Sequence, residues 1–332
     1  MESKKGKAKL IVKYLKQYPD TRDYTISKKI YSENKHIFTS LEEVRSTVRY
    51  YRGHSGEAKR KQVKSEFITP LNWNTKNNLT YVNRETKLKV FTLPKAHKEV
   101  LFLSDIHFPY QNEEALVTAL RYGYEKKVDA IWLNGDILDM YHASDHEKLP
   151  NESSIHEEFE QIINFFEYLR SVFPTAKIYY KEGNHERRWM RFLMRKASEL
   201  LGSPEFELPN ILRLAEYGVT WIENETLVKF GKLNVIHGNE FKGGGGVNPA
   251  RALYMKAKAN VIAGDKHKTG ENTEGNLDGK IVTTWSVGCL CELNPKYLPF
   301  AHVSWNHGFA HISMSGNDFH VQNFRIYNGK ML

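Results

Sequence analysis

The chain has 332 residues, 40% of them apolar, which is enough to bury the core of one large domain and a small one. No apolar run approaches the roughly 20 residues that span a bilayer, and the N-terminus lacks the continuous apolar segment of a secretory signal. We therefore expect a soluble, cytoplasmic protein without a membrane partner. Cys289 and Cys291 stand one residue apart, too close for a disulfide, so both are expected to be reduced.

The net charge of +9 is concentrated near the N-terminus. Residues 1–64 hold 17 Lys and Arg against 7 Asp and Glu, whereas the rest of the chain holds 31 against 32. Such an asymmetry predicts a polyanionic partner for this segment. Nucleic acid is favoured over the alternatives, which are a protein partner and a basic face that is merely solvated.

Three stretches of the basic segment have apolar residues at helical spacing, namely residues 8–18, 26–34 and 41–51. Tyr18-Pro19-Asp20 ends the first stretch. Ser40 is positioned to cap the third, and Glu43 follows three residues later to complete a capping box. These signals predict a small all-helical, helix-turn-helix-like domain over residues 1–62.

The third predicted helix carries Arg45, Arg49 and Arg52 at spacings of four and three, which places them on one helical face. In a helix-turn-helix unit this face contacts phosphates or base edges, so we assign the three arginines to nucleic-acid binding. The same topology also serves protein contacts. No heptad pattern supports a dimer, and the sequence leaves the oligomeric state open.

Residues 63–97 show no sustained period and are expected to form a linker followed by a short β extension. From residue 98 onward, apolar strands alternate with amphipathic helices, and the second half of the chain is richer in strands. We predict an α/β domain over residues 98–332, with two sheets packed as a four-layer α/β/β/α sandwich.

Five polar clusters each follow a predicted buried strand, so their side chains should emerge at one edge of the sheets. They are Asp105-Ile106-His107, Gly135-Asp136, Gly183-Asn184-His185-Glu186, His237-Gly238 and Gly264-Asp265-Lys266-His267. In order and kind they resemble the calcineurin-like metallophosphoesterase pattern D-x-H, G-D, G-N-H-E/D, H, G-H-x-H. The resemblance covers about residues 98–326, and four of the five clusters match in full.

Two divalent ions about 4 Å apart need a shared carboxylate, and Asp136 is the natural bridge. The resemblance implies that Asp105, His107 and His267 complete the first metal site. It assigns Asn184, His237 and Asp265 to the second, with a hydroxide between the metals as the nucleophile.

The family also implies an acid. His185 would donate a proton to the leaving alkoxide, which requires a protonated ring before turnover. Asp139, three residues past the bridge, stands where related phosphatases place the carboxylate that orients this histidine; a solvated loop residue is the alternative.

Asp265 departs from the family pattern, which has a histidine at this position. A carboxylate adds negative charge and hardens the ligand set, which favours Mn²⁺, with Mg²⁺, Zn²⁺ or Fe as alternatives. A weakened second site is the other outcome that this substitution allows.

Three basic residues near the clusters are candidates for binding the substrate phosphate. Arg187 and Arg188 directly follow the third cluster, and Lys242 precedes four consecutive glycines at 243–246. The glycines favour a mobile loop with some control of access.

The leading functional hypothesis is a dimetal phosphodiesterase that acts on nucleic acid, because the basic segment would hold the backbone near the metals. The first alternative is a protein or small-molecule phosphomonoesterase that the N-terminal domain recruits. The second is a binding protein that retains the fold without activity. The chain also resembles bacterial and phage members of the family that carry a helical domain upstream, which implies a bacterial cytoplasm.

Overall fold

The computed structural model describes residues 4–53, 88–145, 147–148, 154–242, 246–275, 277–295 and 303–332. The chain forms two compact units, residues 1–85 and 86–332. Of the predicted linker and β extension at 63–97, positions 63–87 lie outside the described residues. No helix in the described ranges is long and apolar enough to cross a membrane.

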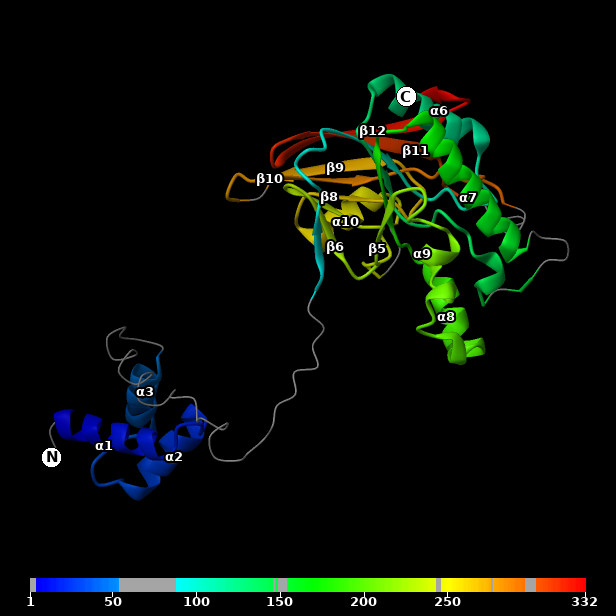
Figure 1. Cartoon of the computed structure of the whole chain (residues 1–332). Helices are drawn as coiled ribbons and strands as arrows, with labels where there is room; N and C mark the ends of the chain where they lie inside the picture. The colour runs from blue at the N-terminus through cyan, green and yellow to red at the C-terminus, as the bar shows by residue number, and fades with distance from the viewer. Residues whose placement is uncertain are drawn as a thin grey trace. The chain divides into compact units, whose positions relative to one another are not determined.

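Within its described residues, 4–53, the N-terminal unit contains three helices around a core of its own (Figure 1). They are α1 (Lys4–Gln17), α2 (Asp23–Glu33) and α3 (Leu41–Arg52). Their buried residues are Ile11, Leu15, Ile26, Ile30, Phe38, Val44 and Val48. The helical spacing in the sequence therefore predicts this small domain correctly.

The start of α3 differs in one detail from the prediction. Ser40 caps the helix as expected, since its Oγ accepts a hydrogen bond from Glu43 N at 3.2 Å. The Glu43 carboxylate does not return to Ser40, however. It accepts from Thr39 N at 2.8 Å and from Lys7 Nζ at 2.7 Å, so it joins α3 to α1 instead of closing a capping box.

The three arginines of α3 have different surroundings. Arg52 donates to two carbonyl oxygens of the α1–α2 turn at 2.9 and 3.0 Å and pairs with Asp23 at 3.2 Å. Arg45 pairs with Glu42 at 2.8 Å, and Arg49 is exposed. Arg52 is thus part of the unit's own packing, and its assignment to nucleic-acid binding stays a prediction.

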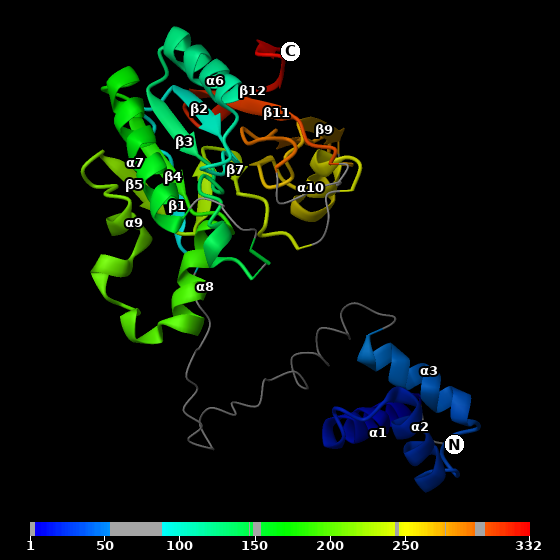
Figure 2. The same ribbon diagram turned by 90° about the vertical axis from the view of Figure 1, so that its right-hand side faces the viewer.

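The second unit has four layers (Figures 1 and 2). Helices α6 (Glu113–Lys126) and α7 (Ile155–Val172) cover a seven-stranded sheet, and α10 (Pro249–Ala257) covers a six-stranded one. Between the sheets lies a core that includes Phe102, Trp132, Phe230, Val235 and Trp285. The predicted α/β/β/α sandwich is confirmed.

The seven-stranded sheet has the order β13-β12-β11-β2-β3-β4-β5. Strands β2 to β5 are parallel to one another, and β11, β12 and β13 extend the sheet in antiparallel pairing. The strands are β2 (Glu99–Leu103), β3 (Ala130–Leu133), β4 (Lys177–Lys181), β5 (Val219–Ile222), β11 (His307–Ser315), β12 (Asp318–Tyr327) and β13 (Lys330–Met331).

The six-stranded sheet has the order β1-β6-β7-β8-β10-β9. Its edge strand β1 pairs in parallel with β6, so the β extension belongs to this sheet. The strands are β1 (Val90–Thr92), β6 (Leu227–Phe230), β7 (Leu233–Val235), β8 (Val261–Ala263), β9 (Gly270–Gly275) and β10 (Ile281–Ser286). Two short helices, α8 (Glu186–Lys196) and α9 (Leu208–Ile211), connect β4 to β5.

The two sheets bring their loops together at one edge. Asp105 follows β2, Asp136 follows β3 and Asn184 follows β4, and these three strands are parallel. His237 follows β7 and Asp265 follows β8, which are also parallel to each other. Because the carboxyl ends of parallel strands share one edge, all five predicted clusters converge there.

Glu43 provides a test of the N-terminal packing. Its hydrogen bonds, first from Lys7 and then from Thr39, lower its pKa to about 2. A lowered folded-state pKa means that this stabilisation is present above about pH 4.5 and is lost as the pH falls towards 2. We expect Glu43→Gln to lower the stability of a fragment of residues 1–64 at pH 7, relative to the unchanged fragment, in urea unfolding monitored by circular dichroism.

The pH profile supplies the control. The fragment with Glu43 should lose stability between pH 4.5 and 2, and the Gln variant should lose less. Glu42→Gln is the matched variant, because Glu42 lies in the same helical turn and, among the described residues, pairs only with Arg45 at the surface. Identical profiles for the Glu43 variant and the unchanged fragment would contradict the assignment.

Candidate metal centre

The loops that carry the predicted ligands have unusual backbone conformations. Ten non-glycine residues among those described have positive φ, and half of them are predicted ligands. These are Asp105 (57°), His107 (55°), Asp136 (51°), Asp265 (62°) and His267 (53°). Such left-handed conformations are costly and concentrate at functional sites, where surrounding structure enforces them. The fold therefore holds these side chains against local preference.

The structure brings the residues of the first predicted site together. His267 Nε2 lies 3.2 Å from Asp105 Oδ1 and 3.3 Å from His107 Nε2. His107 Nε2 is 4.0 Å from Asp136 Oδ2. Ligand atoms of Asp105, His107 and Asp136 all lie within 4.8 Å of one another, a separation that one cation can span.

The second predicted site shares Asp136 with the first. His237 Nε2 lies 3.2 Å from Asp136 Oδ2 and 3.9 Å from Asp265 Oδ1, and these three residues form another group within 4.8 Å. Lys266 Nζ lies 2.6 Å from the Asp265 carboxylate. The lysine thus offsets the negative charge that Asp265 introduces in place of a histidine.

Two observations show that a cation fits this arrangement. Asn184 Oδ1 is buried without a hydrogen-bond partner, and His237 Nε2 faces carboxylate oxygens without a hydrogen bond of normal geometry. Buried polar atoms normally have partners, so lone pairs left in this way are the donors a metal ion uses. The residues present therefore suit the two-ion site that the sequence predicts.

The electrostatics favour positive charge at the same place. Burial disfavours the charged form of His237, but Asp136, Asp105 and Asp265 outweigh it and raise the pKa of that ring well above its usual value. The pKa of His267 is raised likewise, because Asp105 outweighs burial. The carboxylates stabilise a proton on these rings, and a bound cation can take over that role.

Hydrogen bonds on the far side of each ring aim its Nε2 at the centre. His107 Nδ1 lies 3.0 Å from Asp139 Oδ2, and His237 Nδ1 donates to the Asn134 carbonyl at 2.6 Å. His267 Nδ1 faces Cys291 Sγ at 3.9 Å. Partners of this kind fix the tautomer of a metal-ligating histidine and its ring orientation.

The predicted acid, His185, lies beside the ligands, with Nε2 3.7 Å from Asp136 Oδ2. Its Nδ1 hydrogen-bonds to the Asp139 carbonyl at 2.8 Å, and Arg188 donates to Nε2 at 3.0 Å. Burial is the main cause that lowers the pKa of His185 to about 4. A pKa of about 4 favours the neutral ring at pH 7, and the protonated ring expected before turnover stays a prediction.

Asp139 has a different partner from the predicted one. Its carboxylate hydrogen-bonds to His107, whereas His185 Nδ1 lies 3.6 Å from that carboxylate. The residue orients His185 through its backbone carbonyl. Asp139 is buried, so the alternative of a solvated loop aspartate is wrong.

The three residues predicted to bind the substrate phosphate have different surroundings in the structure. Arg188 lies against His185 and donates to the Asp139 carbonyl at 2.7 Å, so it is within the site. Arg187 instead pairs with Glu225 in the turn after β5. Lys242 is exposed, and positions 243–245 of the glycine run lie outside the described residues.

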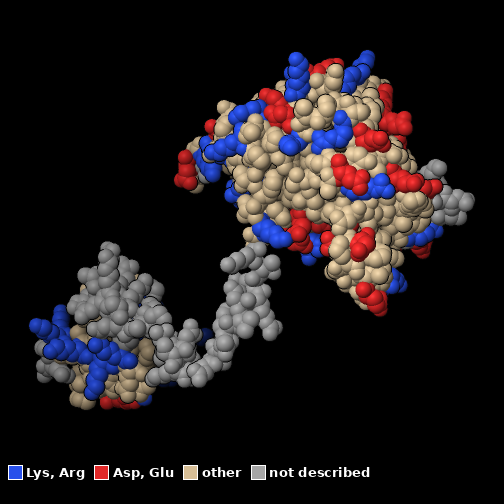
Figure 3. Space-filling model, viewed as in Figure 1, with Lys and Arg blue, Asp and Glu red and all other residues tan. Residues whose placement is uncertain are grey.

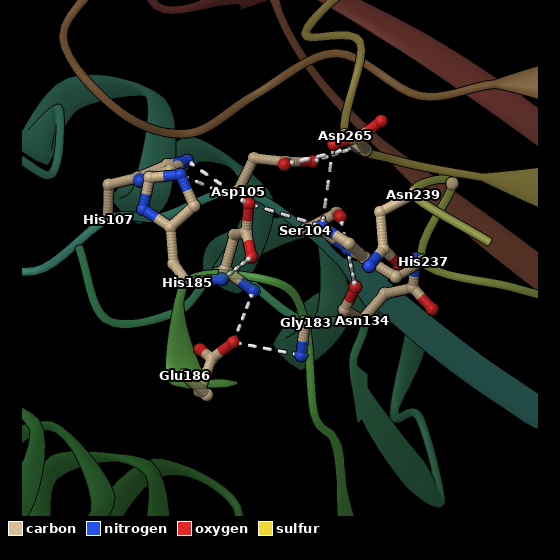
Figure 4. Close-up of polar contacts among 12 residues, drawn as sticks. Ser104, Asp105, His107, Asn134, Gly183, His185, Glu186, His237, Asn239 and Asp265 are labelled. Carbon is tan, nitrogen blue, oxygen red and sulfur yellow. Dashed lines mark hydrogen bonds and ion pairs between the residues drawn. The ribbon is translucent and has the colours of Figure 1, made fainter. Parts of the chain in front are cut away.

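Glu186 is a site residue that sequence reasoning left without a role. Its carboxylate accepts hydrogen bonds from the backbone N–H groups of residues 136, 137, 138 and 183 at 2.7–3.1 Å, and from Tyr180 Oη at 2.7 Å. Figure 4 shows it below Gly183 and the ligand loops. It holds the Asp136 loop to the Asn184 loop. Its position in the third cluster was the sequence signal that could have indicated this role.

A buried ion pair supports the His237 loop in a similar way. Glu240 accepts from the backbone N–H groups of His237 and Gly238 at 3.0 and 2.7 Å. Lys181, which is fully buried at the end of β4, lies 3.1 Å from Glu240. A lysine inside an apolar strand was the sequence signal for this pair, since buried lysines require a partner.

Gly264 shows why glycine precedes a ligand in these clusters. A Cβ at this position would lie 2.0 Å from Ser104 Oγ and 2.5 Å from Asp105 Oδ2. Gly183 is similar, since its Cβ would lie 2.3 Å from Asp136 Oδ1. Both glycines therefore leave the space that the ligand carboxylates occupy.

We expect Gly264→Ala to displace Asp105 and to weaken Mn²⁺ binding by at least about tenfold, as measured by isothermal titration calorimetry. Gly275→Ala is the matched control, because no atom lies within 4 Å of a Cβ there. Equal Mn²⁺ affinity in both variants would show that the close approach at Gly264 is not needed to position Asp105.

The comparisons with known proteins agree with this geometry. The model of the calcineurin-like phosphoesterase family matches residues 98–262. No curated protein matches the chain.

Three similar solved structures share low sequence identity with this chain. Vacuolar protein sorting 29 from Cryptosporidium parvum is 15% identical, with 71% of this chain and 95% of that chain covered and a TM-score of 0.37. The phosphoesterase YfcE from E. coli is 14% identical, with 64% and 87% covered and a TM-score of 0.32. A dimetal phosphatase from Danio rerio is 12% identical, with 69% and 96% covered and a TM-score of 0.35. The family match itself shows that residues 98–262 form a calcineurin-like phosphoesterase domain.

Proposed function

We propose that this chain is a dimetal phosphodiesterase that cuts nucleic acid, with Mn²⁺ as its preferred ion. The observation that carries the proposal is the pair of ligand groups that share Asp136 at the meeting edge of the two sheets. The ligand set is rich in oxygen, with carboxylates from Asp105, Asp136 and Asp265 beside the imidazoles. Such a mixture suits Mn²⁺ better than softer ions.

Two bound divalent ions would supply an activated water and neutralise phosphate oxygens, so the protein needs no nucleophile of its own. The role of the chain is to fix the ligands. Asp136 is buried and is held at its backbone by Glu186, so it cannot move independently of the Asn184 loop. This rigidity is what a preorganised site requires.

His185 and Arg188 are the groups placed to act on the substrate. His185 Nδ1 bonds to the Asp139 carbonyl, so Nε2, which accepts from Arg188 at 3.0 Å, is the nitrogen that would exchange a proton with a leaving oxygen. Arg188 lies next to this nitrogen and carries a fixed positive charge into a buried site. It is therefore suited to pair with a phosphate oxygen that enters beside His185.

The choice of nucleic acid as substrate is supported by the distribution of charge. The excess of basic residues belongs to residues 1–64, while the remaining residues hold 31 Lys and Arg against 32 Asp and Glu. A basic unit tethered to a nearly neutral phosphoesterase would raise the local concentration of a polyanionic substrate.

The test compares Mn²⁺-dependent hydrolysis of bis-p-nitrophenyl phosphate and p-nitrophenyl phosphate. We expect the diester to be cleaved faster. Asp136→Ala should abolish activity because both ligand groups lose their shared member, and His185→Ala should lower kcat by about 10²–10⁴. His156→Ala is the matched control, because His156 lies on α7 and its side chain pairs at the surface with Glu160 alone in the part of the chain that the structure describes.

Each result has a defined meaning. Preference for the monoester would contradict the diesterase assignment and favour a phosphatase. Absence of hydrolysis with Mn²⁺, Mg²⁺, Zn²⁺ and Fe²⁺ would contradict an enzymatic function. Nicking of supercoiled plasmid DNA by the unchanged protein, lost in Asp136→Ala, is the further result that we expect for a nuclease.

A further inference from the structure

Helix α1 carries an unusual distribution of charge. It contains six lysines and no acidic residue. Lys7 pairs with Glu43 and belongs to the packing of the unit. We define the lysine stripe as Lys5, Lys9 and Lys13, which are exposed and lie at intervals of four residues. Lys and Arg side chains gather on the N-terminal unit in Figure 3.

The lysine stripe is regular and available. At a rise of about 1.5 Å per residue, its members follow one another about 6 Å apart along the helix. Within the described part of the chain, none of the three ammonium groups forms an ion pair or a hydrogen bond. The stripe therefore presents three free ammonium groups in a row.

This arrangement is unfavourable for the helix itself. Lysines near a helix N-terminus oppose the helix dipole, and like charges at i and i+4 repel each other. The helix is held by burial of Ile11 and Leu15 in the core of the unit. Since the charges do not assist folding, a role in binding accounts for them better.

We propose that the lysine stripe binds the phosphate backbone of nucleic acid without reading its sequence. Lysine meets a phosphate as a point charge, whereas base reading relies on planar, bidentate groups such as arginine. The arginines of α3 are less available, because Arg52 is engaged in the α1–α2 turn and Arg45 pairs with Glu42. The binding face thus shifts from α3 to α1.

The surface does not suit a lipid membrane. Membrane-binding helices place apolar residues beside the basic face. In α1 the apolar residues Ile11 and Leu15 are buried, and Leu10 packs against the same core. The inference rests on the proposed function in taking nucleic acid as the polyanion, but binding can be measured without hydrolysis.

The experiment uses the full chain with EDTA, so that DNA is not cut, and a fluorescent 20-base-pair duplex. Binding is measured between 50 and 200 mM KCl for the unchanged chain and for the triple variant Lys5→Gln, Lys9→Gln, Lys13→Gln. Three phosphate contacts contribute about 2.7 to the slope of log affinity against log salt. We expect the slope for the variant to be smaller by this amount. Over this range of salt, the affinity of the variant should therefore fall about 40-fold less than that of the unchanged chain.

The controls separate the stripe from other causes. Lys95, Lys177 and Lys330 are exposed on the phosphoesterase unit, and their joint change to Gln alters net charge equally. This control should keep the full salt slope of the unchanged chain. If it loses as much slope as the stripe variant, net charge explains the binding and the proposal is overturned. A larger loss of slope in the double variant Arg45→Gln, Arg49→Gln would overturn the proposal and favour binding through α3. Unchanged far-UV circular dichroism is expected for the triple variant, because Gln removes repulsion within α1.

Two further readouts complete the test. Duplexes of unrelated sequence should bind the unchanged chain with equal affinity, and strong preference for one would contradict backbone recognition. Stripe-dependent binding to phosphatidylserine vesicles that exceeds binding to DNA would overturn the proposal in favour of a lipid surface. Diester hydrolysis with Mn²⁺ should persist in the triple variant, so failure of this inference and failure of the proposed function are distinguishable.

Discussion

The concentration of buried negative charge at the meeting edge of the sheets is the constraint on which the rest of the site depends. Asp105, Asp136 and Asp139 are almost fully buried, and Asp265 lies beside them. Buried carboxylates are strongly unfavourable unless cations or hydrogen-bond donors compensate them. Imidazoles provide part of this compensation, which explains why the pKa of His237 and His267 is raised. Two divalent ions would provide it more completely.

Supporting groups outside the ligands hold this arrangement in place. Glu186 gathers backbone N–H groups from two ligand loops, and Glu240 does the same for the His237 loop with Lys181 as its counter-charge. Both carboxylates therefore satisfy donors that the left-handed turns would otherwise leave buried and unpaired. These supports connect the strained loops to one another. A change at Glu186 is therefore expected to displace several ligands together.

Alternation of strands and helices predicted the four-layer fold, and the position of each polar cluster after an apolar strand predicted which side chains meet. The sequence could not show the tertiary partners. Asp139 contacts His107 through its carboxylate and His185 through its backbone carbonyl, and both histidines are far from it in the sequence. Burial is the main cause that lowers the pKa of His185, and His107 and Arg188 lower it further. Arg52 donates hydrogen bonds to carbonyl oxygens of the α1–α2 turn, which is far from it in the sequence.

We propose that loops from both sheets build one centre for two ions, with Asp136 between them. Anomalous scattering from a crystal of the full chain soaked in Mn²⁺ tests this most directly. The account predicts two peaks roughly 3.5–4 Å apart, one near His107 and His267 and the other near Asn184 and His237, with the Asp136 carboxylate between them. A single peak, or a peak held by His107, His267 and Cys291 instead, would contradict it.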